Sequence, residues 1–243
     1  MIDYRSVIAN ESSRMLDAVV AGPLDARVPG CPDWDLAQLA THLGWVQRWA
    51  TYIVTNKTPP GQGEVPEAPS DPSEAPGYLA ASAPPLLAAL DAANATDACW
   101  NFTKVDQMVS FWWRRQAIEV ACHRFDAQSA NGRAEPLDPG VAVDTIDEFL
   151  NTIVGRVLGR TKADTSALVG DVHVHCTDIA GEWTFQVIDG SFTVRTDHTK
   201  AAAALRGTAS DLALYLYNRV SSSRLERFGD AALIDAWKSI LRF

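Results

Sequence analysis

The chain has 243 residues, of which 47% are hydrophobic and 21% charged, a composition that excludes disordered and fibrous proteins. With 30 acidic and 21 basic residues the net charge is -9, and no basic patch stands out, so we expect neither nucleic-acid binding nor docking on anionic membranes. A chain of this length buries enough surface for one large core or two modest ones, and we expect two domains.

The first part of the chain has the apolar spacing of amphipathic helices. Apolar residues three and four positions apart predict a helix over residues 4–20, which a Gly-Pro pair ends. Asp35 is a favourable N-cap and Gln38 completes a capping box, so a second helix should begin there and continue through Ile53. Residues 58–77 are rich in proline and acidic side chains and predict a surface loop.

Three further helices are predicted before residue 160. In the first, over residues 79–93, Pro84 and Pro85 either kink the helix or mark its start. The strongest helical pattern covers residues 109–130, and residues 143–158 carry another apolar stripe.

After about residue 160 the apolar period changes to that of strands. Alternation predicts a strand over residues 172–177 and a hairpin around Asp189-Gly190, a dipeptide typical of tight hairpin turns. A strand over 201–205, a helix capped by Ser210-Asp211 and a last helix over 231–241 complete this part.

This change of pattern predicts two domains of different class. Residues 1–160 should form a helical bundle, and residues 161–243 a small α+β domain with a mixed or antiparallel sheet. No signal peptide or membrane-spanning run is evident, so we expect a cytoplasmic protein. The four cysteines are scattered without a CxxC pair, which indicates reduced, mostly buried thiols.

Three polar residues lie on predicted interior faces of two helices. His42 alternates with apolar positions of the second helix, and Glu119 and His123 are four apart on one face of the helix over 109–130. Buried imidazoles and carboxylates need partners, and one divalent metal ion would serve all three. Two histidines and a carboxylate leave coordination positions open for water or substrate, as in catalytic zinc sites.

Each of these residues also has an ordinary structural interpretation. A histidine such as His42 is often a core residue that is hydrogen-bonded to a neighbour. Glu119 can be explained by an i to i+4 ion pair with Arg115.

The other histidines are less suggestive. His173 and His175 share one face of a predicted strand, and the alternating valines make it the face toward solvent or a cleft, so a second metal site there is disfavoured. His198 lies in a predicted turn and should be exposed.

Several stretches of the chain carry a family resemblance. They are residues 34–43 (WDLAQLATHL), 111–127 (FWWRRQAIEVACHRFDA), 207–212 (GTASDL) and 216–219 (LYNR). Together they resemble the mycothiol-dependent maleylpyruvate isomerase family, a group of DinB-like bundles, over most of the chain.

The resemblance implies a four-helix bundle that binds a divalent metal ion, usually zinc, through His42, Glu119 and His123. It also implies a C-terminal domain similar to sterol carrier proteins.

An arginine of the C-terminal domain is further implied in activity. Arg219 is our candidate, and Arg224 and Arg206 compete with it. Two positions depart from the family, since Asn218 stands where glycine is expected and Tyr217 where tryptophan is common.

The implied activity is a metalloenzyme reaction with mycothiol as the thiol cosubstrate. A metal ion beside a thiol stabilises the thiolate, which can add to a small electrophile for isomerisation or for S-transfer. The alternatives are a thiol-independent metallohydrolase on the same bundle and a non-catalytic protein that binds a small ligand. The sequence leaves the oligomeric state open.

Overall fold

The computed structural model describes residues 2–103 and 105–241, which divide into two compact units, Met1–Glu135 and Pro136–Phe243. The division precedes the boundary expected at residue 160. The reason is that helix α6 (Pro139–Glu148) packs against helix α8 (Ala209–Leu216) of the second unit.

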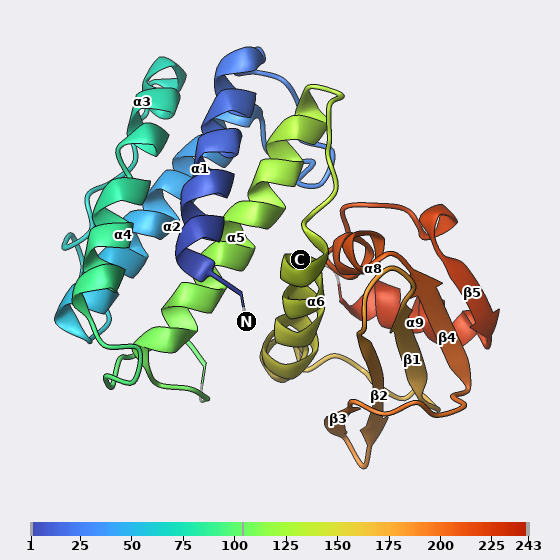
Figure 1. Ribbon diagram of the computed structural model, residues 1–243. Coiled ribbons are helices and arrows are strands. Elements are labelled where there is room, and N and C mark those ends of the chain that lie inside the picture. Colours follow the sequence, from blue (N-terminus) through green and yellow to red (C-terminus); the bar gives the residue numbers. More distant parts are fainter. Residues whose placement is uncertain (1, 104, 242–243) are drawn as a thin grey trace. The chain divides into compact units, whose positions relative to one another are not determined.

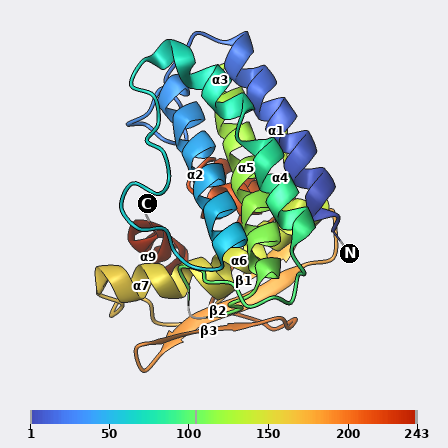
Figure 2. The same ribbon diagram turned by 90° about the vertical axis from the view of Figure 1, so that its left-hand side faces the viewer.

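The N-terminal unit is a bundle of helices, as predicted, and its long helices run side by side in Figures 1 and 2. Its elements are α1 (Tyr4–Ala21), α2 (Leu36–Asn56), η1 (Pro72–Glu74), α3 (Ala75–Ala80), α4 (Ala83–Ala92) and α5 (Val109–Ala130). Elements η1 and α3 begin inside the segment that the sequence predicted as a loop. Pro84 and Pro85 lie in the first turn of α4, so they mark a helix start and do not kink a longer helix.

The start of α2 confirms the predicted capping box. The Asp35 carboxylate accepts a hydrogen bond from the Gln38 amide N–H at 2.8 Å, and the Gln38 side chain accepts one from the Asp35 N–H at 2.9 Å. Both bonds satisfy amide groups that a helix start leaves without partners. They fix where α2 begins and therefore the position of every side chain along it.

A buried ion pair joins α1 to α5. The Arg124 side chain is 0% exposed, and its Nε donates to Glu11 Oε2 at 2.6 Å. Arg124 Nη1 also donates to Gln128 Oε1 at 2.8 Å and to the Glu135 carbonyl at 2.6 Å. Because a buried charge is stable only when it is paired, these contacts fix the two helices against each other.

The C-terminal unit contains a mixed sheet whose described strands follow the order β3-β2-β1-β4-β5. The strands are β1 (Val172–Cys176), β2 (Glu182–Ile188), β3 (Ser191–Arg195), β4 (Ala203–Gly207) and β5 (Glu226–Gly229). Strands β1 and β4 are parallel, and the other neighbours are antiparallel. Helices α8 and α9 (Ala231–Ile240) pack against this sheet (Figure 1). The α+β class is confirmed.

Some predicted boundaries in this unit change. The helix expected over 143–158 is continuous in sequence but divided into α6, a π-helical turn η2 (Phe149–Ile153) and α7 (Val154–Thr161). Strand β5 was not predicted. The N-cap of α8 is Thr208, whose hydroxyl accepts from the Asp211 N–H at 3.1 Å, and not the Ser210-Asp211 pair.

The predicted hairpin turn at Asp189-Gly190 is present, with φ angles of 49° and 75°. Such positive values suit the tight turn between β2 and β3, where glycine meets no steric penalty. No helix among the described residues combines the length and apolarity that crossing a membrane requires. None of the four cysteines, all of them among the described residues, forms a disulfide, and of the four Cys31 alone is not fully buried.

Replacing Gly229 by Ala should destabilise the C-terminal unit by more than about 2 kcal/mol. Its φ is +72°, and a Cβ there would lie 2.2 Å from the Ala202 carbonyl oxygen. Gly190→Ala is the matched control, because Gly190 has φ +75° but no atom within 4 Å of the added Cβ. Urea unfolding should therefore show a smaller loss for Gly190→Ala, and equal losses would contradict the predicted clash.

Candidate functional site

The N-terminal unit brings His42, Glu119 and His123 together, as the sequence predicted. His42 projects from α2, and the other two project from α5 one turn apart. Glu119 Oε1 lies 3.5 Å from His42 Nε2 and 3.3 Å from His123 Nε2. All three donor atoms lie within 4.8 Å of one another.

These separations suit a shared metal ion. Two donors bound at 2.0–2.1 Å to a tetrahedral ion lie about 3.4 Å apart, close to both measured distances. Two imidazoles and one carboxylate are also a donor set that zinc and several other divalent ions accept. The residues therefore fit the group that the family resemblance implies.

The site is closed on one side and open on the other. The His123 side chain is only 8% exposed and that of Glu119 18%, whereas the His42 side chain is 32% exposed. The expectation that His42 points into the interior is thus correct only in part. Of the three side chains, His42 is the most exposed to solvent.

The two oxygens of Glu119 have different partners. Oε1 faces the histidines, and Oε2 accepts a hydrogen bond from the Arg115 guanidinium. Burial favours a raised pKa, but the charge of Arg115 and hydrogen bonds from both histidines hold the pKa of Glu119 well below its usual value. Glu119 thus forms the ion pair with Arg115 and also contacts both histidines. The sequence had offered these as separate interpretations.

Asp126 orients the ring of His123, a role the sequence analysis missed. Its Oδ2 lies 2.9 Å from His123 Nδ1, and its side chain is 0% exposed. Burial tends to lower the pKa of His123, but hydrogen bonds to Asp126 and Glu119 and their charges raise it to about 9. A carboxylate on one ring nitrogen directs the other nitrogen to a ligand position. The i to i+3 spacing between His123 and Asp126 was the available signal.

Trp34 and Cys31 complete the surroundings of the site. The Trp34 ring packs on that of His42, with centroids 4.6 Å apart, immediately before the Asp35 N-cap. Cys31 Sγ lies 3.8 Å from Asp126 Oδ2. Cys31, His123 and Asp126 are thus a second possible donor set, but this set would take His123 Nδ1 away from its hydrogen bond.

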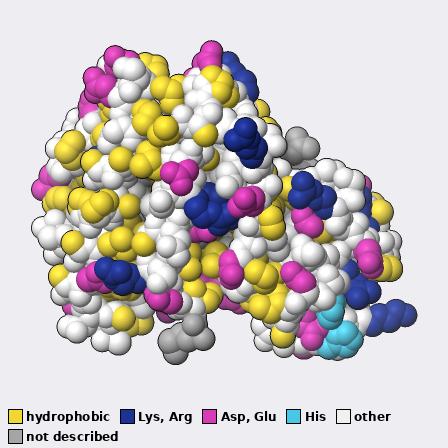
Figure 3. Space-filling view, turned by 45° about the horizontal axis from the view of Figure 1, so that its top comes forward, with side chains coloured by type: hydrophobic (Ala, Val, Ile, Leu, Met, Phe, Trp, Pro, Cys, Tyr) yellow, Lys and Arg dark blue, Asp and Glu magenta, His cyan; other side chains and the backbone are white. Residues whose placement is uncertain are grey.

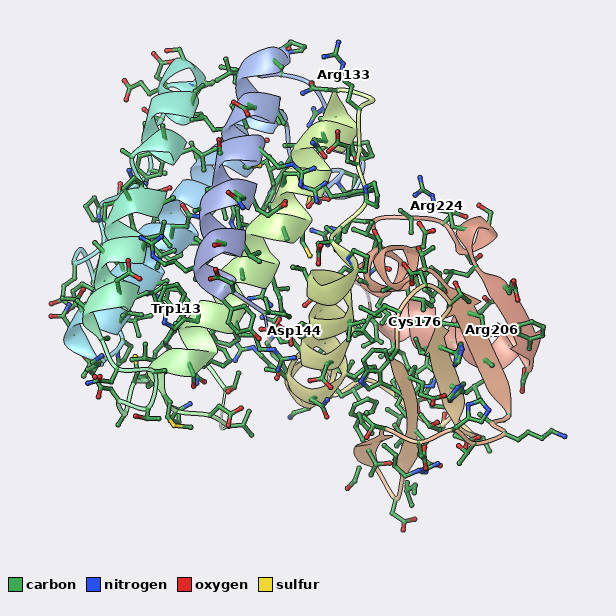
Figure 4. All side chains as sticks on the ribbon, viewed as in Figure 1. Trp113, Arg133, Asp144, Cys176, Arg206 and Arg224 are labelled. Carbon is green, nitrogen blue, oxygen red and sulfur yellow. The ribbon has the colours of Figure 1, made fainter. Side chains whose placement is uncertain are left out.

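Arg219, the predicted catalytic arginine, belongs to the C-terminal unit. It follows α8, and its Nη1 donates to the Tyr217 carbonyl at 2.7 Å. The competing arginines form exposed ion pairs within the same unit: Arg206 lies 3.6 Å from Glu226 and Arg224 3.1 Å from Asp211 (Figure 4).

Asn218 occupies a left-handed backbone position, with φ of 67°. Glycine is favoured in this conformation and asparagine tolerates it better than most residues, which explains how Asn218 replaces the glycine expected there. Its side-chain amide also donates to the Leu241 carbonyl at 2.7 Å. Asn218 therefore accommodates the left-handed turn before Arg219.

Buried thiols of the protein are poor nucleophiles. Burial raises the pKa of Cys176 (labelled in Figure 4) to about 12, and burial also raises that of Cys99. A thiol reagent at pH 8 should therefore modify Cys31 first and reach Cys99 and Cys176 only after denaturation. Rapid labelling of a native Cys31→Ser variant, followed by mass spectrometry, would show that this expectation is wrong.

Two family models match nearly the whole chain. The model described as the mycothiol maleylpyruvate isomerase N-terminal domain matches residues 6–128, and the MDMPI C-terminal domain matches residues 140–236. A comparison with curated proteins and one with solved structures each found no match. The interval between the two models contains the division between the two units. With both domains matched, in order and over most of its length, the chain belongs to the mycothiol maleylpyruvate isomerase family.

Proposed function

We propose that this chain is a divalent-metal-dependent enzyme that activates a low-molecular-weight thiol, mycothiol, for isomerisation of a small electrophile or for S-transfer to it. Membership of the family supports an activity like that of maleylpyruvate isomerase. One observation carries the metal dependence: the donor atoms of His42, Glu119 and His123 converge within 4.8 Å on the accessible side of the bundle.

In this proposal His42 and His123 bind the ion through Nε2 and Glu119 binds it through Oε1. Zinc is the first candidate, because it accepts imidazole and carboxylate donors and catalytic zinc sites commonly have three protein ligands. A bound divalent ion would supply positive charge that favours the thiolate form of a thiol beside it.

Other residues of the chain act by position and charge. Arg115 keeps Glu119 ionised, and Asp126 holds the His123 ring so that Nε2 faces the donors. The Trp34 ring packs against the His42 ring at a tilt of 43° and would limit its rotation. Arg219 is proposed to bind an anionic group of the substrate, because its planar guanidinium can hold a carboxylate by two parallel hydrogen bonds.

The decisive experiment combines metal analysis with a thiol-dependent assay. Protein purified without added metal should contain zinc or another divalent ion, and turnover of maleylpyruvate should require mycothiol. Turnover of an ester or amide without any thiol would instead favour the metallohydrolase. Metal-free protein with full mycothiol-dependent turnover would contradict the proposed metal dependence.

An apolar cavity among the described residues of the C-terminal unit does not support the non-catalytic alternative. This cavity, lined by residues that include Phe185, Leu205 and Trp237, measures about 20 Å³. Pockets for small-molecule ligands occupy about 300–1,000 Å³. The cavity is therefore a gap in the packing, and copurification of a lipid without metal would be the result that revives this alternative.

Replacing Asp126 by Asn should weaken zinc binding by about 10–100-fold, the usual effect of removing the outer partner of a metal-bound histidine. The amide no longer provides the charged acceptor that orients His123. Zinc affinity can be measured by competition with a chromophoric chelator. Asp91→Asn, which removes an exposed carboxylate paired with Arg5, is the control and should bind zinc like the unaltered protein. Equal affinities for the two variants would exclude the orienting role of Asp126.

A further inference from the structure

Two histidines lie on the face of the sheet opposite the core of the C-terminal unit. Val172 and Val174 of β1 are buried with Trp183 and Leu205, so the alternate residues of β1 point to the other face. On that face His173 is paired with Thr184 of β2, and His175 with Glu182.

The strand order explains why a third histidine joins them. Strand β3 lies at the edge beyond β2, and β4 lies on the other side of β1, so the connection over residues 196–202 has to cross β2 and β1. It crosses the histidine face. His198 Nδ1 lies 2.7 Å from Glu182 Oε2, and Thr199 Oγ1 lies 3.3 Å from Thr184 Oγ1.

The result is a cluster of three imidazoles around one carboxylate oxygen. Glu182 Oε2 lies 3.4 Å from His173 Nε2 and 3.4 Å from His175 Nδ1, and all four donor atoms lie within 4.8 Å of one another. The two 3.4 Å separations equal the spacing of about 3.4 Å between donors of a tetrahedral zinc ion. Figure 3 shows histidine side chains gathered beside an acidic one at the surface.

The ring of His173 is fixed in position through Nδ1, but its other nitrogen, Nε2, lacks the hydrogen bond that a buried polar atom requires. Its side chain is 9% exposed, and its Nδ1 lies 3.0 Å from the Thr184 hydroxyl, which fixes the ring. Within residues 2–103 and 105–241, Nε2 of this ring has no hydrogen-bond partner. A buried ring nitrogen aimed at a carboxylate and two further imidazoles is explained by an ion between them.

Cations opposite the cluster in the sheet register are paired with carboxylates outside it. Arg206, opposite His175, lies 3.6 Å from Glu226 of β5, and Arg195, opposite Thr184, lies 3.1 Å from Asp197.

We propose that His173, His175, Glu182 and His198 form a second divalent-metal site, separate from the donors of the helical bundle. Three imidazoles and a carboxylate favour zinc, and four protein ligands are typical of structural zinc sites and not of catalytic ones. The ion ties the 196–202 connection to the sheet. The His198 side chain is 79% exposed, so an ion would enter the proposed site from the side of this residue.

Metal stoichiometry of the full-length chain tests this site. Titration with Zn²⁺ against a chromophoric chelator should give two equivalents for the unaltered protein and one for His198→Ala, whose exposed position makes loss of folding no concern. Zinc affinity at the altered site should fall at least about 100-fold. Mutation of a residue that only hydrogen-bonds to a metal ligand already lowers affinity by about 10–100-fold, and loss of the ligand itself should cost more. Glu182→Gln should give the same result, and Lys200→Ala, a non-ligand in the same connection, should keep both equivalents.

A second readout reports on the connection itself. Zn²⁺ should slow tryptic cleavage after Lys200 in the unaltered protein and have no such effect in His198→Ala. The proposal is overturned if His198→Ala and Glu182→Gln bind as much zinc as the unaltered protein. Substitution of His42 distinguishes the two sites, because it should remove only the ion of the bundle. A His42→Ala protein that still binds one equivalent, lost on adding His198→Ala, supports the second site whether or not the bundle is catalytic.

Discussion

Replacing His42 or His123 by Ala should lower zinc affinity at the bundle site by at least about 100-fold and abolish mycothiol-dependent turnover. Each substitution removes one of the three donor atoms of described residues that converge there. The two donor atoms that remain should bind a divalent ion no more tightly than many surface sites do. The effect on folding should be small for His42→Ala, because the His42 side chain is 32% exposed.

Elemental analysis after dialysis, made in a His198→Ala background so that only the bundle site is counted, measures the first effect, with circular dichroism to confirm folding. The mycothiol-dependent assay measures the second. Asn56→Ala, at the exposed end of α2, is the control and should keep full metal and turnover. Glu119→Gln keeps the side-chain shape but removes the charge, and should show an intermediate loss of metal. Full occupancy of the bundle site in both histidine variants would refute the proposed site.

The second large effect concerns stability. Glu11→Ala should reduce the free energy of unfolding by about 3–5 kcal/mol, the usual result of removing one partner of a buried ion pair. The Arg124 side chain is 0% exposed and would keep its charge without the carboxylate that lies 2.6 Å away. Urea unfolding monitored by tryptophan fluorescence would measure the loss.

A double variant separates the loss of the Glu11–Arg124 attraction from the cost of leaving the Arg124 charge buried without this partner. Replacing Glu11 by Leu and Arg124 by Met removes both charges and should recover most of the stability, because apolar replacements of buried ion pairs are often neutral. Arg14, which contacts Glu11 at 2.7 Å with a partly exposed side chain, provides the control: Arg14→Ala should cost less than about 1 kcal/mol. A loss below about 1 kcal/mol for Glu11→Ala itself would mean that Arg124 finds other partners.

Local patterns predicted the elements that carry the bundle site. The capping box at Asp35 and Gln38 set the start of α2, and the apolar stripe over 109–130 gave the bounds of α5. Once both helices face the same interior, spacings of three and four decide which side chains meet. The proximity of His42, Glu119 and His123 could therefore be predicted from the sequence, and their binding of a metal stays a proposal.

The features that were missed depend on contacts between distant parts of the chain. The position of α6 in the second unit follows from its packing against α8, which is distant in sequence. His198 reaches Glu182 only because the order of strands sends residues 196–202 across the sheet. Alternation along β1 placed His173 and His175 on one face, as observed, but could not show that a crossing segment covers that face and buries His173.

The two oxygens of Glu119 have different partners, and this limits how the carboxylate can bind a ligand. Oε2 is engaged by Arg115, so in the proposed site Glu119 would bind an ion through Oε1. Any further donor to a bound ion would then come from outside these three residues. In the proposed site Arg115 would in this way leave positions for the thiol and its electrophile.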